Sequence, residues 1–427
     1  QSRGLGDVYK RQVLHTIDER EQICDNCGST MVKVGEEFVR TEVQFIPAKL
    51  KVIDHYRETY ECRSCRKNGT PYMEKAPVPY PPVLHSLASA STITWLIHQK
   101  FELSIPLYRQ EKEWEALGLR LSRATMSNWL LVVYRDWLVH IVHRLKLELL
   151  KQRYLHIDET HVQVLKEPGR KNTSDSYMWV YCSIRDAVNP IRYFEYQPGR
   201  SGKYPEAFLR EYEGYIHTDA YSGYNAVSGV KRCLCYTHLR RAFVDALPKD
   251  IHNSEASKPA EAILRLNQLF NIESELEALP PDQKKKERLI REKPLLEAFW
   301  SWAEKSAIGE LPKSKLSKAF HYALNNREGF WNYLEDGNCS ISNSLAENCI
   351  RPFVIGRKNW LFSGSPKGAE ASAGIYTLVE TAKANGLAPM KYIKYILSDM
   401  PGSAFLEHPE YLDDYLPWNP LVKEFCR

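Results

Sequence analysis

Three acidic residues lie in apolar segments in a way that suits metal binding. Asp158 ends the apolar run 154–158, Asp219 ends a second run, 214–219, and Glu347 lies among apolar residues at helical spacing. Two carboxylates at strand ends and one on a helix can converge on two Mg²⁺ or Mn²⁺ ions, which prefer carboxylate oxygens. Such ions can hold the attacking and leaving oxygens of a phosphodiester displacement. Each acid alone is better explained as the cap of a strand or helix, so the prediction depends on all three.

Four cysteines near the start of the chain form two CxxC pairs, and this spacing suits a tetrahedral zinc ion. They are Cys24, Cys27, Cys62 and Cys65. The segments 39–46 and 50–56 between the pairs are predicted to be strands of a small ribbon. Accidental pairs or a redox pair are the alternatives. A redox motif needs only one CxxC, so we predict one structural Zn²⁺ ion.

The composition is typical of a globular protein with more than one structural unit. The chain has 427 residues, with 43% hydrophobic and 26% charged residues. Its apolar stretches are too short to span a membrane, and no secretory signal opens it, so we expect a cytoplasmic protein. A net charge of +5 permits nucleic-acid binding without demanding it. The ten cysteines are expected to be metal ligands and buried thiols rather than disulfides.

The elements that must position the acids and cysteines divide the chain into consecutive regions. The first residues lack an initiating Met and resemble a translated adapter sequence. We predict a non-native scar at 1–12, a zinc-binding module at 13–68, a proline-rich linker and helices at 69–150, the first part of an α/β core at 151–250, a helical insertion at 251–335, the second part of the core at 336–395, and a C-terminal element at 396–427.

The region after the linker shows a helix-turn-helix pattern. Segment 107–117 reads as a helix ended by a glycine, and 123–130 as a second helix with a serine N-cap. Arg123 and Asn128 on the second helix could reach bases or phosphates, while Trp129 should face the core. A purely structural helical hairpin would show the same pattern.

The rest of the chain predicts an α/β fold with a mixed sheet. Strands are expected at 154–165, 177–184, 191–196 and 214–218, with a helix at 203–212. A strand hairpin, a helix and a returning strand are typical of an RNase H-like sheet.

A mostly helical stretch separates Asp219 from Glu347. Within it, the charged run 284–288 is predicted to be a solvated helix face rather than a DNA clamp. After the Glu347 helix, basic and aromatic residues suit DNA strands near the metal site, although core packing would equally explain Trp360 and Phe362.

The order of these motifs resembles that of bacterial insertion-sequence transposases of the IS66 family. The resemblance is carried by the two CxxC pairs, the segment 107–129, the stretches around Asp158, Asp219 and His238, and the run 343–362. It implies an RNase H-like domain with an Asp-Asp-Glu triad, onto which Asp158, Asp219 and Glu347 map. The four cysteines map onto the family's zinc-binding module.

The resemblance also implies a function and partners. A transposase of this kind cuts the terminal inverted repeats of its element and joins them to target DNA, as a homo-oligomer on DNA, with accessory proteins of the same element. Such a protein would be nucleoid-associated in a bacterial cytoplasm when active. His238 could orient the scissile phosphate or could be a packed histidine. An RNase H-like nuclease that does not join DNA, and a domesticated zinc-dependent DNA-binding regulator, are the alternatives.

Two features depart from the family pattern. The leucine-zipper-like segment usual before the zinc module is lacking, which bears on oligomerisation and end recognition. Some related transposases carry a basic residue seven positions after the glutamate, where this chain has Val354. The candidates for that role in binding DNA are Arg351, Arg357 and Lys358.

Overall fold

The computed structural model describes residues 13–40, 48–248 and 257–427. The predicted scar at 1–12 and most of the predicted strand 39–46 therefore lie outside the described residues. The chain divides into two units, 1–52 and 53–427, and each is described by itself.

The first unit contains the first cysteine pair in a tight turn. The 3₁₀ turn η1 (Glu19–Glu21) precedes it. The Gly28 N–H donates to the Cys24 carbonyl at 2.8 Å, and Ile23 forms an antiparallel bridge with Thr30. Gly28 has a φ of 70°, a conformation that glycine adopts at little cost. The sequence therefore closes a knuckle-like turn around the first CxxC pair.

The second cysteine pair lies in a short hairpin of the second unit. Strands β1 (Thr59–Glu61) and β2 (Met73–Lys75) pair antiparallel, with α1 (Arg63–Lys67) between them. The predicted strand 50–56 is wrong, because residues 48–58 form no regular secondary structure. A strand is stable only with a pairing partner. The strands that do pair with each other, β1 and β2, lie on either side of the second CxxC pair.

A group of helices follows, as the sequence predicted. Ser122 caps the second helix of the predicted helix-turn-helix, accepting from the Thr125 N–H at 3.1 Å. Trp129 is only 5% exposed, which confirms its place in the core. The elements are α2 (Ala90–Ile97), the π-helical turn η2 (His98–Glu102), α3 (Leu107–Ala116), α4 (Arg123–Val133), the π-helical turn η3 (Tyr134–Leu138) and α5 (Val139–Leu150).

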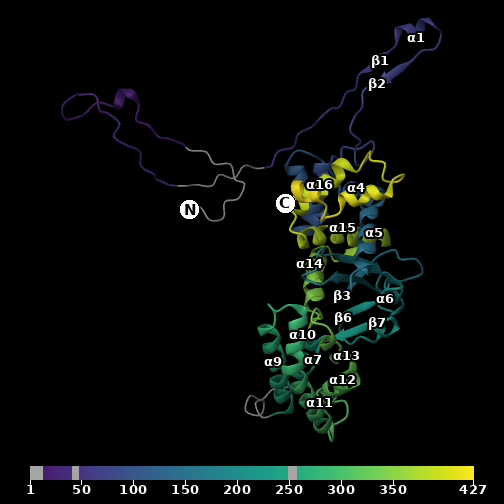
Figure 1. The fold of residues 1–427 in the computed structure, drawn as a ribbon. Coiled ribbons are helices and arrows are strands. Elements are labelled where there is room, and N and C mark those ends of the chain that lie inside the picture. Colours follow the sequence, from purple (N-terminus) through teal and green to yellow (C-terminus); the bar gives the residue numbers. More distant parts are fainter. Residues whose placement is uncertain (1–12, 41–47, 249–256) are drawn as a thin grey trace. The chain divides into compact units, whose positions relative to one another are not determined.

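The centre of the second unit is a mixed sheet with the order β5-β4-β3-β6-β7, and a short strand, β8, pairs with the end of β3 (Figure 1). Pairs β3–β4 and β4–β5 are antiparallel, whereas β3–β6 and β6–β7 are parallel. The mixed sheet that the sequence predicted is therefore present. Its elements are β3 (Tyr154–Val164), β4 (Asp175–Ser183), β5 (Arg192–Gln197), helix α6 (Lys203–Phe208), β6 (Gly214–Thr218), the 3₁₀ turn η4 (Ser222–Ala226), β7 (Val230–Leu234) and β8 (Phe362–Ser363).

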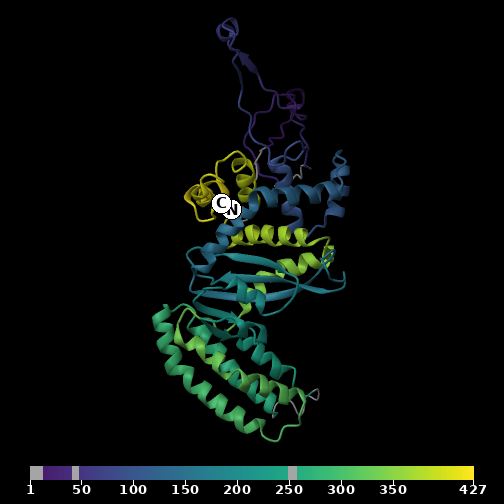
Figure 2. The same cartoon turned by 90° about the vertical axis from the view of Figure 1, so that its right-hand side faces the viewer.

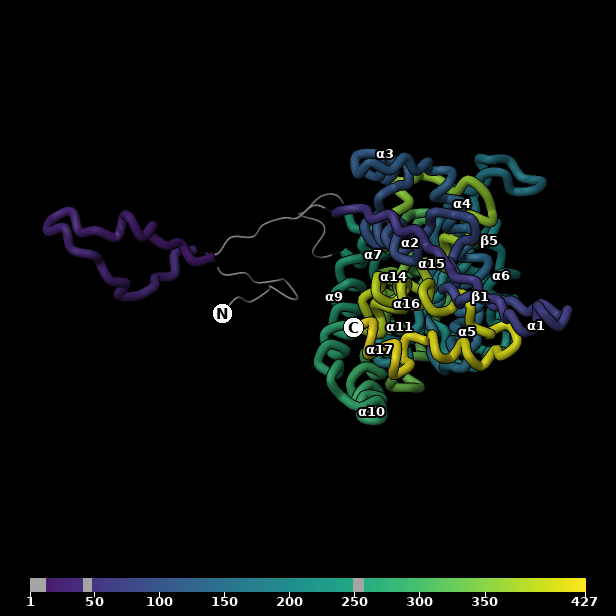
Figure 3. Tube along the Cα trace, turned by 90° about the horizontal axis from the view of Figure 1, so that it is seen from above, coloured from purple at the N-terminus to yellow at the C-terminus, as the bar shows by residue number. Residues whose placement is uncertain are grey.

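Helices α14 (Ser344–Trp360) and α15 (Pro366–Ala384) pack against the sheet, and Figure 2 shows α15 running along it. Thr377 and Thr381 of α15 accept hydrogen bonds from the backbone N–H groups of Phe194 and Arg192 on β5, at 2.8 and 3.1 Å. Beyond α15, α16 (Pro389–Asp399) contacts both α2 and α17 (Pro420–Cys426), with η6 (Pro409–Tyr415) between α16 and α17 in the chain (Figure 3).

A second group of helices has a hydrophobic core of its own, which continues onto β7 through Cys233 and Leu234. Asn332 joins this group to β7 by donating to the Arg232 carbonyl at 2.8 Å. The group comprises α7 (Tyr236–Val244), α9 (Lys258–Glu275), α10 (Pro281–Arg291), α11 (Lys293–Ala307), α12 (Lys315–Asn325), α13 (Arg327–Trp331) and η5 (Asn332–Glu335).

One expectation for this helical group is corrected. The run 284–288 was predicted to be a solvated face, but the Arg288 side chain is fully buried. Its guanidinium bonds the Glu273 carboxylate at 2.5 and 2.8 Å and donates to the carbonyls of Tyr333, Asp336 and Cys339. A buried charge is tolerated when it is paired and fully hydrogen-bonded, and that pairing cannot be read from the run itself.

None of the helices formed by the described residues is both long enough and apolar enough to span a bilayer.

Candidate active site

Two of the three predicted acids lie next to each other because of the sheet register. In the parallel pair β3–β6, His156 is opposite His217. Asp158 and Asp219 each follow two residues later, Asp158 within β3 and Asp219 just beyond the end of β6, so the two acids lie at the same level of neighbouring strands. Parallel neighbouring strands bring their carboxyl ends to one edge of a sheet, where α/β proteins commonly bind ligands.

The third acid is positioned by the buried residue that begins its helix. Asn343 donates from Nδ2 to the Ile157 carbonyl at 2.8 Å, and its Oδ1 lies 3.0 Å from Nδ1 of His156. Its backbone N–H donates to Sγ of Cys235 at 3.1 Å. These bonds fix the start of α14 against β3, directly beside Asp158. Glu347 then follows in the first turn of α14.

The electrostatics show that the three carboxylates interact. The pKa of Asp158 is raised from 3.8 to about 7, first by burial and then by the charge of Glu159. The charges of Asp219 and Glu347 raise it further, while a hydrogen bond from the Glu159 N–H opposes the shift. Like charges held together in this way favour a proton or a cation in their midst.

Glu347 lies near two basic side chains, and one of its carboxylate oxygens forms no hydrogen bond among the described residues. Its Oε1 lies 3.6 Å from Nδ1 of His238, and its Oε2 lies 3.9 Å from Arg241. Glu347 Oε1 and His238 Nδ1 are both buried, and neither atom forms a hydrogen bond with the described residues. Cys235, His238 and Glu347 bring their ligand atoms within 4.8 Å of one another. Unpaired buried polar atoms are uncommon and point to a missing partner.

Sequence reasoning missed a fourth acid and its partners. Glu159 accepts from Arg200 Nε and from the Tyr224 hydroxyl, both at 2.6 Å. Arg200 also lies 3.9 Å from Asp219. Burial raises the pKa of Glu159, and the bonds from Tyr224 and Arg200 oppose that rise. Glu159 was visible beside Asp158 in the sequence, but nothing in the sequence around Arg200 signalled this pairing.

Arg232 of β7 holds the turn that carries Asp219. Its guanidinium donates to Thr218 Oγ1 at 2.7 Å and to the carbonyls of Asp219 and Tyr221 at 2.6 and 2.8 Å. A pocket of about 390 Å³ opens next to this turn. Its lining includes Arg200, Asp219, Tyr221, His238 and Arg241. The pocket therefore places two guanidinium groups beside the acids, where phosphate oxygens could be bound.

The predicted DNA contacts lie in different environments. Arg123 and Asn128 are exposed on α4, and Arg351 and Lys358 are exposed on α14. Arg357 is half-buried and donates to Thr160 Oγ1 of β3 at 3.1 Å, so its side chain is tied to the sheet.

Trp360, the last residue of α14, and Phe362 of β8 lie in different environments. Trp360 packs against the core, with the Lys100 ammonium 4.1 Å from the centre of its ring. Phe362 is 45% exposed. Core packing therefore explains Trp360 but not Phe362.

The cysteines of the predicted zinc site fall in the two separate units. Cys24 and Cys27 belong to the first unit, and Cys62 and Cys65 to the second. The pKa of Cys27 is lowered by hydrogen bonds from Ser29 and then from Cys24, and the pKa of Cys62 by hydrogen bonds from Cys65. The hydrogen bond with Cys62 raises the pKa of Cys65, so within the second pair the thiolate that binds metals is favoured at Cys62 alone. The meeting of both pairs on one ion stays a prediction.

Comparison with known proteins agrees with this arrangement of motifs. Residues 85–371 match the model of the transposase IS66 family, and residues 21–66 match the zinc-finger binding domain of transposase IS66. The uncharacterized protein y4hP of Sinorhizobium fredii is 26% identical, over 96% of this chain and 75% of its own length. The uncharacterized protein y4qI of the same organism is 27% identical, over 98% and 80%. The chain therefore belongs to the transposase IS66 family and carries its zinc-finger domain.

Proposed function

We propose that this chain cuts the ends of its insertion element and joins them to target DNA at a metal centre formed by Asp158, Asp219 and Glu347. Membership in the family implies transposition, and the proposal concerns how the chemistry is done. The observation that carries it is the register of β3 with β6, which brings Asp158 level with Asp219, together with the buried Glu347 Oε1, which forms no hydrogen bond among the described residues. In this proposal an RNase H-like core, 151–250 and 336–395, is interrupted by the helical insertion 251–335.

The residues fit a pair of Mg²⁺ or Mn²⁺ ions. The three carboxylates are hard oxygen donors, and Glu347 Oε1, which forms no hydrogen bond among the described residues, is available as one of them. Bound there, two such ions would polarise the scissile phosphate and stabilise charge on the attacking and leaving oxygens. The alternative role for these acids as simple caps does not account for the buried Glu347 Oε1, which forms no hydrogen bond among the described residues.

The protein's own groups supply the positioning. Arg200 and Arg241 present guanidinium donors on the pocket beside Asp219, where they can hold the phosphates that flank the cut. His238, between Glu347 and this pocket, can orient the scissile phosphate. Arg232 and Asn343 fix Asp219 and α14, so that the acids need little reorganisation when DNA arrives. A released 3′-hydroxyl that stays in this pocket can then attack target DNA.

DNA is the partner in this proposal, in the form of terminal inverted repeats and target duplex. The exposed residues Arg123 and Asn128 of α4 contact the repeats, and Arg351, Arg357 and Lys358 contact strands near the acids. The zinc finger, with one ion on Cys24, Cys27, Cys62 and Cys65, adds a second DNA-binding element. Assembly as a homo-oligomer on DNA and accessory proteins of the same element belong to the proposal as well.

The test is a cleavage and joining assay with full-length protein. Duplexes carrying the element's terminal repeats are incubated with Mg²⁺ and a supercoiled target plasmid. Nicks with a 3′-hydroxyl at the repeat end, and repeat ends joined to plasmid, are the expected products, and Glu347→Gln should yield neither. Nicks without joined products would support a nuclease instead. Specific binding without any nick would support a DNA-binding regulator.

A further inference from the structure

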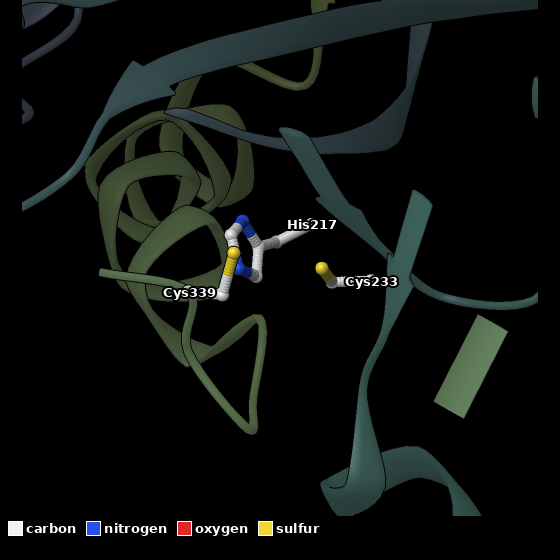
Figure 4. A group of neighbouring side chains, drawn as sticks. All are labelled: His217, Cys233 and Cys339. Atoms are coloured by element: carbon white, nitrogen blue, oxygen red, sulfur yellow. The ribbon is translucent and has the colours of Figure 1, made fainter. Parts of the chain in front are cut away.

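A cluster of one imidazole and two thiols lies inside the second unit and is formed by residues outside the zinc finger. His217 is on β6, Cys233 is on the neighbouring strand β7, and Cys339 follows η5 in the segment that returns from the helical group. All three residues are buried, and a ring nitrogen and both sulfurs lie within 4.8 Å of one another. Figure 4 shows the imidazole beside the Cys339 sulfur, with the Cys233 sulfur directed toward them. The pattern of one nitrogen and two sulfurs suits a thiophilic ion.

The histidine of this cluster is held as a metal ligand is held. Its Nδ1 lies 3.1 Å from the Leu155 carbonyl, which can only accept, so Nδ1 carries the proton. Its Nε2 accepts from the Ser340 N–H at 2.8 Å, so Nε2 is unprotonated and its single lone pair is engaged in that hydrogen bond. Histidine ligands commonly donate their second N–H to a backbone carbonyl in this way. His156 stacks on the ring at 4.2 Å and fixes its plane.

We propose that His217, Cys233 and Cys339 bind one Zn²⁺ ion, distinct from the ion of the zinc finger and from the ions at the acids. Two thiolates and a divalent cation sum to zero, so the buried cluster acquires no net charge. In a tetrahedral site with Zn–S bonds of about 2.3 Å, ligand atoms lie roughly 3.5 to 4 Å apart. The three groups would therefore close by up to about 1 Å, and Nε2 would exchange its contact with Ser340 for the ion.

The two thiols differ in how readily they lose a proton. A hydrogen bond between them lowers the pKa of Cys339, which His217 lowers further, and raises the pKa of Cys233, which burial raises as well. Arg288, whose guanidinium donates to the Cys339 carbonyl at 2.8 Å, adds positive charge near the sulfurs. Metal binding releases thiol protons, and a cationic neighbour favours that release.

The ion would join three parts of the chain that position Asp219 and Glu347. His217 lies two residues before Asp219, and Cys339 lies four residues before Asn343, which starts α14. The ion would therefore fasten the return from the helical group onto the sheet. This role is structural and does not depend on the proposed cleavage chemistry.

The chain offers a matched control for the cluster. Cys182 of β4 and Cys349 of α14 form another close cysteine pair, hydrogen-bonded to each other. Neither belongs to any group of potential metal ligands found among the described residues. Cys349→Ala should therefore leave the zinc content unchanged.

The test counts zinc in full-length protein purified under reducing conditions. We expect two ions per wild-type chain, one in Cys62→Ser/Cys65→Ser, one in Cys339→Ala, none when these changes are combined, and two in Cys349→Ala. With the finger disabled, Co²⁺ should still give thiolate-to-cobalt charge-transfer absorption. A Cys62→Ser/Cys65→Ser chain that binds neither zinc nor Co²⁺ would overturn the proposal. So would a second ion that survives both Cys339→Ala and Cys233→Ser.

A second measurement decides the matter if Cys339→Ala does not fold. In the Cys62→Ser/Cys65→Ser chain, zinc at about 100 times its dissociation constant should raise the melting temperature, because it binds only the native state. Ca²⁺ at the same concentration should not, since it prefers oxygen ligands. An unchanged melting temperature with zinc would count against the site.

Discussion

The cysteine-bearing N-terminal region and the central sheet obtain their order in different ways. None of the described residues from 13 to 81 is buried, although this stretch includes both CxxC pairs. In the sheet, Ile157, Val180 and Ile216 are completely buried. A sheet with such a core holds its acids by packing and hydrogen bonds, whereas a short segment without a core needs a metal to fold. The same chain thus contains one self-supporting site and one that depends on its ligand.

Substitution of the three acids should produce the largest loss of DNA cleavage and should leave the zinc finger unaffected. Asp158→Asn, Asp219→Asn and Glu347→Gln should each lower cleavage of terminal repeats by about a thousandfold or more, because an interaction with the developing charge is lost. The melting temperature should not fall for Asp158→Asn, since the amide resembles the uncharged carboxyl that burial favours at this position. Asp186→Asn, at an exposed turn between β4 and β5, is the control. Wild-type cleavage by any of the three variants would exclude that acid from the metal centre.

Removal of zinc from the finger should affect the other region alone. Cys62→Ser should lose the finger's ion and leave amides across residues 20–68 open to hydrogen exchange, because none of the described residues in this segment is buried. Amides of β3 and β6 should keep their protection. The measurement is hydrogen exchange followed by mass spectrometry. Protection lost equally in both regions would contradict the contrast between them.

The pH dependence should come from the sheet and from Asp158 in particular. Its pKa of about 7 exceeds the ordinary value of 3.8, so between these values the metal-free native state holds a proton that the unfolded state has lost. Stability without metal should therefore decrease as pH rises from about 4 to 7. Cleavage should increase over the same range, by roughly tenfold per pH unit at limiting Mg²⁺, and level off above about pH 7.

Metal competition provides the check on that assignment. Because Mg²⁺ and the proton compete for the same carboxylate, a tenfold increase in Mg²⁺ should move the midpoint of the pH–rate curve to lower pH, by up to about one unit. Cleavage measured at several Mg²⁺ concentrations gives the result directly. A midpoint that does not move with Mg²⁺ would assign the titration to another group.

The smallest effect is expected at the exposed face of α4. Arg123→Ala and Asn128→Ala should weaken binding to terminal repeats by about 1–3 kcal/mol, with a smaller loss on random duplex, because base contacts carry the sequence preference. Lys112→Ala on α3, also exposed, is the matched control. Competition binding at fixed salt measures both affinities. Equal losses on both DNAs would mean that α3 and α4 form a structural hairpin.

The sequence predicted those parts of the site that depend on local pattern. Apolar runs ending in an acid located Asp158 and Asp219, and the parallel pairing of β3 with β6 then places them side by side. Helical spacing located Glu347. The side of α4 that holds Trp129 also followed from helical periodicity. Local pattern is sufficient where one strand or helix determines where a side chain points.

Other features depend on distant partners and could not be predicted from local pattern. Arg288 lies in a run of charges, yet its burial depends on Glu273 and on carbonyls about 50 residues further along the chain. Arg200 meets Glu159 only because the loop after β5 returns to β3. The segment 50–56 has the composition of a strand but, among the described residues, finds nothing to pair with. Pairing is a property of the folded chain and not of a single segment.

The hydrogen bonds between β5 and the threonine hydroxyl groups of α15 have a consequence for association between copies of this chain. Thr377 and Thr381 accept hydrogen bonds from backbone N–H groups of β5, one outer strand of the sheet. Asn332 donates a hydrogen bond to a backbone carbonyl of β7, the outer strand on the opposite side. An outer strand with free amides and carbonyls invites addition of a strand from another molecule and hence aggregation. In the homo-oligomer on DNA proposed above, these bonds would disfavour pairing between the sheets of neighbouring copies.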